Sequence, residues 1–544
     1  MDLLLSIFNC FLSESQTLIF DTIEKFQLWL RPIFNWNEFD IERLWELLYY
    51  QPDSPILFST GLFFFLFIGF LMIFMSLRRF TLMRMIYVSL FSLYFYYKTS
   101  GLWFLLLLFT ATSDFMIGRC IWLTKTDWKR KGLVLLSVAI NLGMLGYFKY
   151  TNFLYQTGVM LLQQVGTALH IPSLSELTYT PMDIFLPVGI SFFTFQSLSY
   201  IIDLYRSKIR SLTRWVDYLF FVSFFPGLVA GPIVRARDFV PQMYKKPSLS
   251  REQLGEALYL IICGLLKKCV ISDYLSVNFV DRIFDAPALY TGVENLLGVY
   301  GYALQIYCDF SGYSDMAIGI ALLLGIRFNI NFDSPYRSAT ITEFWRRWHI
   351  SLSSWLKDYL YISMGGNRKG KVRTYIHLLI TMLLGGLWHG AALRFILWGG
   401  LHGCALALHK FAMNHFGSFF KQEGKDMSPL RRVWGVIFTF HIVCFGWIFF
   451  RADSVQIGLD VLNQIYTDFH PEIFMQFVTG YTGVFVLLVV GYILHFIPTH
   501  VENRIKHIVT YSPLLLQALY LIIAIFIVMQ VKSAGIVPFI YFQF

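Results

Sequence analysis

The sequence predicts an all-α, polytopic membrane protein, and three observations carry that prediction. Of its 544 residues, 56% are apolar and only 14% are charged, whereas soluble proteins carry about 25% charged residues. The mean hydropathy is +0.57. The apolar residues form long blocks, many of them near the roughly 20 residues that a helix needs to cross a bilayer. This composition excludes a soluble globular enzyme and a disordered protein.

The first 55 residues differ from the rest. Within 1–50, eight acidic residues accompany three basic ones, and apolar residues recur between them at helical spacing. We therefore expect short amphipathic helices in an extracytoplasmic extension, 1–55. Asp2 occupies the place of the positive region of a signal peptide, and no small-residue cleavage site follows the apolar stretch. We do not expect a cleavable leader.

Apolar blocks then continue to the C-terminal region and predict about eleven transmembrane helices. In the block 216–231, prolines and glycines interrupt any regular helix, so we expect a re-entrant pair of short helices there. We expect a core at 56–455 and further transmembrane helices at 456–544. The other blocks are 57–76, 85–97, 102–123, 133–150, 183–204, 253–275, 292–325, 374–388, 393–413, 432–450, 479–497 and 513–531.

The loops between these blocks predict the orientation. Basic clusters at 78–84, 125–131 and 206–214 are separated by two spans each, so all three fall on one face, which the positive-inside rule makes cytoplasmic. The loop 151–182 contains no Lys or Arg and falls on the other face. Because topology explains the net charge of +10, we expect no nucleic-acid partner.

Two histidines inside apolar blocks are candidates for chemistry, since an ionisable group at the bilayer centre costs about 2.5–3.5 kcal/mol. His389 lies in the run GGLWHGAA, whose glycines permit close approach of a ligand or another backbone. Burial favours the neutral imidazole, which can take a proton from an attacking hydroxyl. A core histidine bonded to a neighbouring helix would produce the same pattern. His402 follows thirteen residues later, between glycines, and either orients a ligand or packs.

The metal-ligating residue types do not gather at ligand spacing. The two histidines lack a carboxylate or thiolate set, and the seven cysteines are scattered without a CxxC pair. We therefore expect no metal site.

A second candidate region, 335–373, combines eight bases and two acids with dense aromatic residues. Arg and Lys suit the phosphates of a nucleotide such as coenzyme A, although a positive-inside loop on anionic lipid would carry the same charge. The aromatic residues favour an interfacial or re-entrant helix bordering a cavity. Glu343 and Arg347 are i,i+4 neighbours and are expected to pair. The candidate residues for binding such a nucleotide, called the donor-binding residues below, are Trp345, Arg346, Arg347, Asn367 and Arg368.

Two further stretches place polar residues in apolar blocks. In 307–315, the carboxylates and hydroxyls, Asp309 and Tyr313 among them, either line a polar tunnel or pair with Arg346 or Arg347. We favour a structural polar network over direct chemistry. The stretch 187–196 predicts a small, polar-lined helix face, for which helix packing is the commoner cause.

These stretches, in this order, resemble the membrane-bound O-acyltransferase (MBOAT) family, and within it most closely the bacterial alginate O-acetyltransferase branch. The resemblance spans roughly 57–455. The segments that carry it are PVGISFFTFQSLSYIIDLYR (187–206), FPGLVAGPIVR (225–235), YCDFSGYSDMAIG (307–319), SPYRSATITEFWRRWHISLSSWLKDYLYISMGGNRKG (334–370), 383–403 and GWIFFRAD (446–453).

The resemblance implies a ring of helices around a central tunnel and a catalytic histidine at the WHG position, His389. It also makes His349, in the WRRWH motif, the second catalytic candidate. Trp388, His402, Asp309 and Tyr313 would line or support the tunnel.

The resemblance also implies the chemistry. Acetyl-CoA would be the cytoplasmic donor substrate, with no permanently bound cofactor, at a bacterial inner membrane. The acetyl group would pass to an extracellular polysaccharide, directly or through a periplasmic SGNH-type acetyltransferase partner. Two alternatives stay open: D-alanyl transfer from a carrier protein to a cell-envelope polymer, and polysaccharide transport. Transporters often contain internal repeats, and we find none in this sequence.

Overall fold

The computed structural model describes residues 47–52, 55–417, 427–531 and 538–540. The chain divides into two compact units, Met1–Pro55 and Ile56–Phe544. Nearly all of the first unit, including the predicted amphipathic helices, lies outside the described residues. The described helices from Gly61 onward belong to the second unit.

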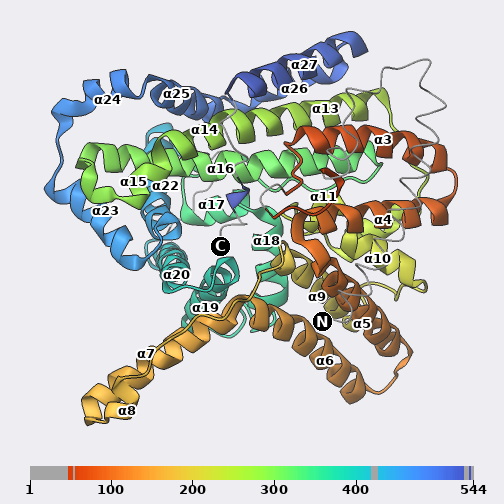
Figure 1. Cartoon of the computed structure of the whole chain (residues 1–544), viewed down its shortest axis with the longest axis horizontal. Helices are drawn as coiled ribbons and strands as arrows, with labels where there is room; N and C mark the ends of the chain where they lie inside the picture. Colours follow the sequence, from red (N-terminus) through yellow and green to blue (C-terminus); the bar gives the residue numbers. More distant parts are fainter. Residues whose placement is uncertain (1–46, 53–54, 418–426, 532–537, 541–544) are drawn as a thin grey trace, which may run out of the picture. The chain divides into compact units, whose positions relative to one another are not determined.

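In the described ranges the regular elements are helices and none is a strand, which confirms the predicted all-α class. Figure 1 shows their arrangement. The longer helices are α3 (Gly61–Leu77), α4 (Thr81–Ser100), α5 (Phe104–Leu123), α6 (Asp127–Leu145), α7 (Thr151–Leu169), α9 (Ile190–Tyr205), α10 (Trp215–Ser223), α12 (Ala236–Met243), α13 (Arg251–Leu265), α16 (Gly292–Leu323), α19 (Lys371–His389), α20 (Leu393–His415), α22 (Pro429–Arg451), α23 (Val455–Thr467), α25 (Thr482–Phe496), α26 (Thr499–Tyr511) and α27 (Leu514–Val531).

Short pieces connect these helices. They are the π-helical segments η3 (Gly146–Tyr150), η4 (Leu266–Ser272), η5 (Ser276–Val280) and η8 (Leu356–Tyr361), the 3₁₀ turns η2 (Gly101–Trp103), η6 (Pro287–Leu289), η7 (Pro335–Arg337) and η10 (Pro471–Ile473), and the short helices α8 (Pro172–Ser175), α11 (Phe225–Leu228), α14 (Asp273–Leu275), α15 (Asp281–Asp285), α17 (Ile341–Arg347), α18 (Ile350–Trp355) and α24 (Phe474–Gly480).

Four helical stretches of the described chain are long and apolar enough to cross a membrane, and a fifth counts if the pair α24–α25, bent by 100°, is one span. The four are Thr81–Leu123, Asp127–Leu169, Pro429–Arg451 and Leu514–Val531. The predicted number of about eleven spans and the central tunnel stay predictions. On α27, Leu515 is 85% exposed, as expected for a helix whose apolar face meets lipid.

The helix α16 forms the centre of the buried core. A capping box starts it: the Thr291 side chain accepts from the Glu294 amide, and the Glu294 carboxylate accepts from the Thr291 amide. Most of its residues are buried. It runs beside α13 (Figure 1). The two backbones approach closely at Gly312, where a Cβ would lie only 2.8 Å from the carbonyl oxygen of Gly264.

Two segments bear on the sequence-based expectations. The predicted re-entrant block forms two short buried helices, α10 and α11, broken at Phe224. The stretch 151–182, expected to be a loop, contains instead the 19-residue α7, which continues α6 through η3. Its Leu, Met and Gln residues favour helix, whereas the absence of Lys and Arg indicates only on which face the segment lies.

Candidate functional site

Close helix packing positions His389 at the end of α19. A Cβ on Gly386 would overlap the carbonyl oxygen of Phe395, and one on Gly399 would overlap that of Met382. The two glycines therefore let α19 and α20 approach backbone to backbone. The chain becomes extended at Gly390, so α19 stops at His389, whose side chain is 3% exposed.

Aromatic rings enclose the His389 imidazole. Trp388, Trp398 and Phe450 present their rings at centroid distances of 5.0, 5.0 and 5.2 Å, all nearly perpendicular to it. This environment excludes water from most of the ring and favours an uncharged imidazole.

One side of His389 faces a cavity of about 70 Å³, which we call the His389 cavity. This exceeds the ~10–15 Å³ that one water needs, so the cavity can hold a small group beside the imidazole. It is lined by Lys149, Leu186, Pro187, Val188, Gly189, Ile190, Ser191, Phe192, Val229, Trp388 and His389.

Two residues that the sequence analysis did not single out hold the end of α19. Lys149 Nζ donates to the carbonyl oxygens of Trp388 and His389, both at 2.8 Å. The hydroxyl of Tyr150 donates to the carbonyl oxygen of Leu387 at 2.6 Å. The sequence contained one indication of this contact: Lys149 is a charged residue inside the apolar block 133–150.

The second catalytic candidate, His349, lies on the other side of Trp388. Its ring centroid is 6.0 Å from that of Trp388 and 4.6 Å from that of Phe310. Its backbone is left-handed, with φ of 42°, where it caps α18. Its Nδ1 is 3.2 Å from Asn331 Oδ1, while Nε2 has no hydrogen-bond partner among the described residues. The structure thus brings His349, Trp388 and His389 together.

His402 lies apart from that group, behind Trp398. Its ring packs against Trp398 at 4.9 Å and Trp345 at 5.1 Å, and within the described ranges neither ring nitrogen has a hydrogen-bond partner. It borders a different cavity, of about 300 Å³, between α20 and α22. His402, predicted to orient a ligand or to pack, thus faces this second cavity. Trp345, predicted to bind the donor, packs against the His402 ring.

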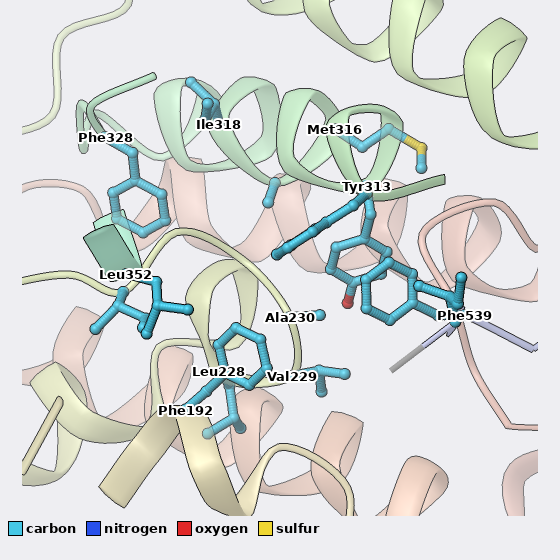
Figure 2. Packing of buried hydrophobic residues seen from close by; sticks show 14 of the residues in the cluster. Phe192, Leu228, Val229, Ala230, Tyr313, Met316, Ile318, Phe328, Leu352 and Phe539 are labelled. Atoms are coloured by element: carbon cyan, nitrogen blue, oxygen red, sulfur yellow. The ribbon is translucent and has the colours of Figure 1, made fainter. Parts of the chain in front are cut away.

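Asp309 and Tyr313 anchor the end of the described chain. Asp309 pairs with the buried Lys268 at 2.8 Å and accepts from the amide of Ile540 at 2.8 Å. The Tyr313 ring packs against Phe539 at 4.9 Å (Figure 2). Neither residue borders the His389 cavity. The contacts of Asp309 fit the polar-network interpretation, whereas the Tyr313 hydroxyl has no hydrogen-bond partner among the described residues.

The predicted donor-binding residues are dispersed. Arg347 donates to Glu343 and Asp333 at 3.1 and 3.0 Å, so the expected i,i+4 pair forms and its guanidinium is already engaged. Arg346, Asn367 and Arg368 are exposed.

A basic cluster that the sequence analysis did not identify lies around Asp358. Arg235 forms an ion pair with the Asp358 carboxylate, and Arg206 donates to the Asp358 carbonyl oxygen at 3.2 Å. Both guanidinium groups lie over the Tyr359 ring, at 5.3 and 5.6 Å. We call Arg206, Arg235, Arg237, Asp358 and Tyr359 the Asp358 cluster; it contains three cations and one carboxylate.

Stacked aromatic rings connect this cluster with the histidine. Trp355, four residues before Tyr359, stacks on Phe195 at 3.8 Å and donates its indole N–H to the Phe195 carbonyl oxygen. Phe195 in turn lies 5.5 Å from Trp388, the neighbour of His389. Within the described ranges, no three His, Cys, Asp or Glu side chains gather as metal ligands.

Comparisons with known proteins identify the family of the chain. The family model for the membrane-bound O-acyltransferase family matches residues 159–451, which include all three candidate histidines. The probable alginate O-acetylase AlgI of Pseudomonas putida is 38% identical over 432 residues, covering 76% of this chain and 84% of that protein.

Two further relatives widen the range of chemistry. The peptidoglycan O-acetyltransferase of Helicobacter pylori is 34% identical over 438 residues, 75% of this chain and 79% of that protein. The teichoic acid D-alanyltransferase of Bacillus subtilis is 31% identical over 293 residues, 50% of this chain and 71% of that protein. With a buried histidine at the end of a helix, apolar spans and these matches, the chain belongs to the membrane-bound O-acyltransferase family and is a multi-pass membrane O-acyltransferase.

Proposed function

We propose that this enzyme transfers an acetyl group from cytoplasmic acetyl-CoA across the bacterial inner membrane to a hydroxyl group that leads to an extracellular polysaccharide. The observation that carries the proposal is the placement of His389 beside a small cavity, joined by stacked aromatic rings to the Asp358 cluster. The printed names of the Pseudomonas and Helicobacter relatives support acetyl as the group.

The length of α19 supports opposite access for the two substrates. Its 19 residues place its two ends about 28 Å apart at 1.5 Å per residue, and it lies outside the four described stretches that are apolar enough to cross a membrane on their own. It begins at the basic turn 368–373, which the positive-inside rule makes cytoplasmic. His389, at its other end, is then near the outer face, where an acceptor hydroxyl arrives.

The donor fits the Asp358 cluster better than the predicted residues at 345–347. Arg347 is engaged by two carboxylates, whereas Arg206 of the Asp358 cluster is held by a carbonyl oxygen and a hydroxyl, those of Asp358 and Ser363. A guanidinium group binds phosphate oxygens in pairs. The pantetheine arm would then follow Trp355 and Phe195 towards His389.

The reaction at His389 is general-base catalysis. The neutral imidazole takes the proton of the acceptor hydroxyl while its oxygen attacks the thioester carbonyl carbon. The resulting tetrahedral oxygen anion then re-forms the carbonyl as the carbon–sulfur bond breaks. The departing thiolate receives the proton from the imidazolium, which regenerates the base.

Transfer of radiolabelled acetyl from acetyl-CoA in inverted membrane vesicles tests this proposal. We expect His389→Ala to lower transfer at least 100-fold, the size of a general-base contribution, while insertion and expression stay normal. The matched control is His500→Ala, which removes an exposed histidine on α26. Retained transfer in His389→Ala would contradict the assigned role.

The position of the label identifies the acceptor. Label released by mild alkali from a protein would indicate an SGNH-type partner, and label on glycan would indicate direct transfer. D-alanyl transfer is the second candidate, because the Bacillus relative carries that name. Activity with a D-alanyl carrier-protein thioester, and none with acetyl-CoA, would favour it. Family membership argues against the transporter alternative.

A further inference from the structure

The segment η3 brings a cation to the reaction centre. It is a five-residue π-helical stretch between α6 and α7, and such stretches are frequent at functional sites because they turn adjacent side chains in a new direction. Here Lys149 and Tyr150, adjacent in sequence, both reach the last turn of α19 and donate to three successive carbonyl oxygens, those of residues 387–389.

Lys149 satisfies more than a structural need. The last carbonyl groups of a helix lack partners within the helix, and a cation there is favourable, so capping explains two of its bonds. An ammonium group has three N–H donors, however, and only two are used by these carbonyl oxygens. Lys149 also lines the His389 cavity, together with His389 and Ser191, so its remaining donor is available to a group inside that cavity.

We propose that Lys149 is a catalytic residue that stabilises the oxygen anion formed on the acyl carbonyl during transfer; the inference rests on the proposed function. As the acceptor oxygen bonds to the carbonyl carbon, the carbonyl π electrons move to oxygen and His389 takes the hydroxyl proton. The ammonium donates a hydrogen bond to that oxygen anion without transferring its proton. Collapse of the intermediate then expels the thiolate, which takes the proton from His389.

The site is suited to this role. A fixed positive charge aimed at developing negative charge acts most strongly where water is excluded, and aromatic rings close off most of the space around His389. The two carbonyl bonds hold the ammonium in place before substrate arrives. The same lysine therefore also orders the helix end that positions the base.

The experiment separates stabilisation of the oxygen anion from helix capping. The variants are Lys149→Met, which removes charge and donors; Lys149→Gln, which keeps N–H donors without charge; Lys149→Arg, which keeps both; and Tyr150→Phe, which removes the third capping bond of the same helix end. For each, kcat and KM for acetyl-CoA are measured in vesicles, and thermal unfolding is measured in detergent.

We expect Lys149→Met and Lys149→Gln to lower kcat about 100- to 1,000-fold, as loss of one oxyanion donor does elsewhere, with KM for acetyl-CoA within threefold of wild type. Tyr150→Phe should lower kcat less than tenfold while lowering the unfolding temperature. The kcat of Lys149→Arg should be at least tenfold higher than that of Lys149→Gln. If Lys149→Met does not fold, the kcat of Lys149→Gln alone tests whether the lysine charge is needed.

Three results would overturn the inference: kcat of Lys149→Gln within tenfold of wild type, equal losses in Lys149→Gln and Tyr150→Phe, or an effect on KM alone. Each of these leaves transfer by the wild type, and with it the proposed function, intact. Absence of transfer by the wild type would instead overturn the proposed function and this inference together.

Discussion

At the scale of single residues, three buried histidines of similar sequence context have different surroundings. His389 faces a small cavity shared with a lysine, His349 lies behind Trp388 with one nitrogen near Asn331, and His402 faces another cavity. A proton-transfer role needs contact with the reacting hydroxyl. The role of His389 stays a prediction, and the proposed function rests on its place beside Lys149 at the small cavity. His349 is then suited to support Trp388 and the wall of the site.

The buried ion pair of Asp309 provides a prediction about stability. Lys268 is 2% exposed and contacts both Asp309 and Asp273 at 2.8 Å. Asp309→Asn removes one of the two carboxylates that bind Lys268, and Asp273 still balances the lysine charge; the loss of a hydrogen bond between charged groups costs about 1.5–3 kcal/mol. We expect Asp309→Asn to lower the unfolding temperature markedly and to loosen the C-terminal segment held by the Asp309 carboxylate.

The matched control for Asp309→Asn lies on the same helix. Asp315 pairs with Lys267 at 2.7 Å, but both side chains are partly exposed. Water can solvate the Lys267 ammonium group when its partner is removed, so Asp315→Asn should lower the free energy of unfolding less than Asp309→Asn does. Thermal unfolding in detergent and limited proteolysis of the C-terminal segment check both variants. Equal unfolding temperatures for the two would show that burial of the Asp309 pair does not matter.

At the scale of elements, the packing of α19 on α20 places the base. Gly386 and Gly399 bring carbonyl groups of the partner helix where a Cβ would stand, and backbone cannot move aside as a side-chain tip can. The helix end that results is then held by Lys149 and Tyr150. The consecutive helices α19 and α20, together with the distant segment η3, therefore fix one imidazole.

A single methyl group tests this packing. We expect Gly386→Ala to separate α19 from α20 and to destabilise the fold by about 1–3 kcal/mol or more, the usual cost of overpacking, with loss of acetyl transfer. Gly143→Ala is the control, since it is helical and a Cβ there meets nothing within 4 Å; it should be neutral or slightly stabilising. Unfolding temperature and vesicle transfer are the measurements, and wild-type values for Gly386→Ala would contradict the argument.

At the scale of the whole molecule, the proposed reaction requires a defined orientation. The basic loops and the uncharged stretch 151–182 predict opposite faces, and the proposed function assigns the Asp358 cluster to the cytoplasmic face and His389 to the other. An acetyl group would thus enter near one surface and leave near the other.

Cysteine labelling tests that orientation. In a chain with its seven cysteines replaced by serine, we expect Thr178→Cys to react with a membrane-impermeant maleimide in intact spheroplasts, and Lys129→Cys to react in inverted vesicles. Both positions are exposed, so access to the reagent depends on sidedness. Labelling of Lys129→Cys in intact spheroplasts would reverse the assignment and place the base near the cytoplasm.

The sequence by itself determined the all-α membrane class, the family and the leading catalytic candidate. Apolar blocks suffice for the class, because a segment in lipid has to satisfy its backbone hydrogen bonds within a helix. The motifs that resemble the family, including the one around His389, suffice for the family, whereas the catalytic role of His389 stays a prediction. The i,i+4 pair of Glu343 and Arg347 was equally predictable, since the helix repeat sets it.

The tertiary structure decided which polar groups meet. Lys149 contacts the carbonyl group of a residue 240 positions away, and Arg235 pairs with a carboxylate 123 positions away. No periodicity encodes such contacts, since they depend on how helices pack. Packing likewise engaged Arg347 with acids, turned Asp309 towards the C-terminal segment and separated His402 from His389. The physical reason is that hydrogen bonds and ion pairs act over a few ångströms in space, whatever the separation along the chain.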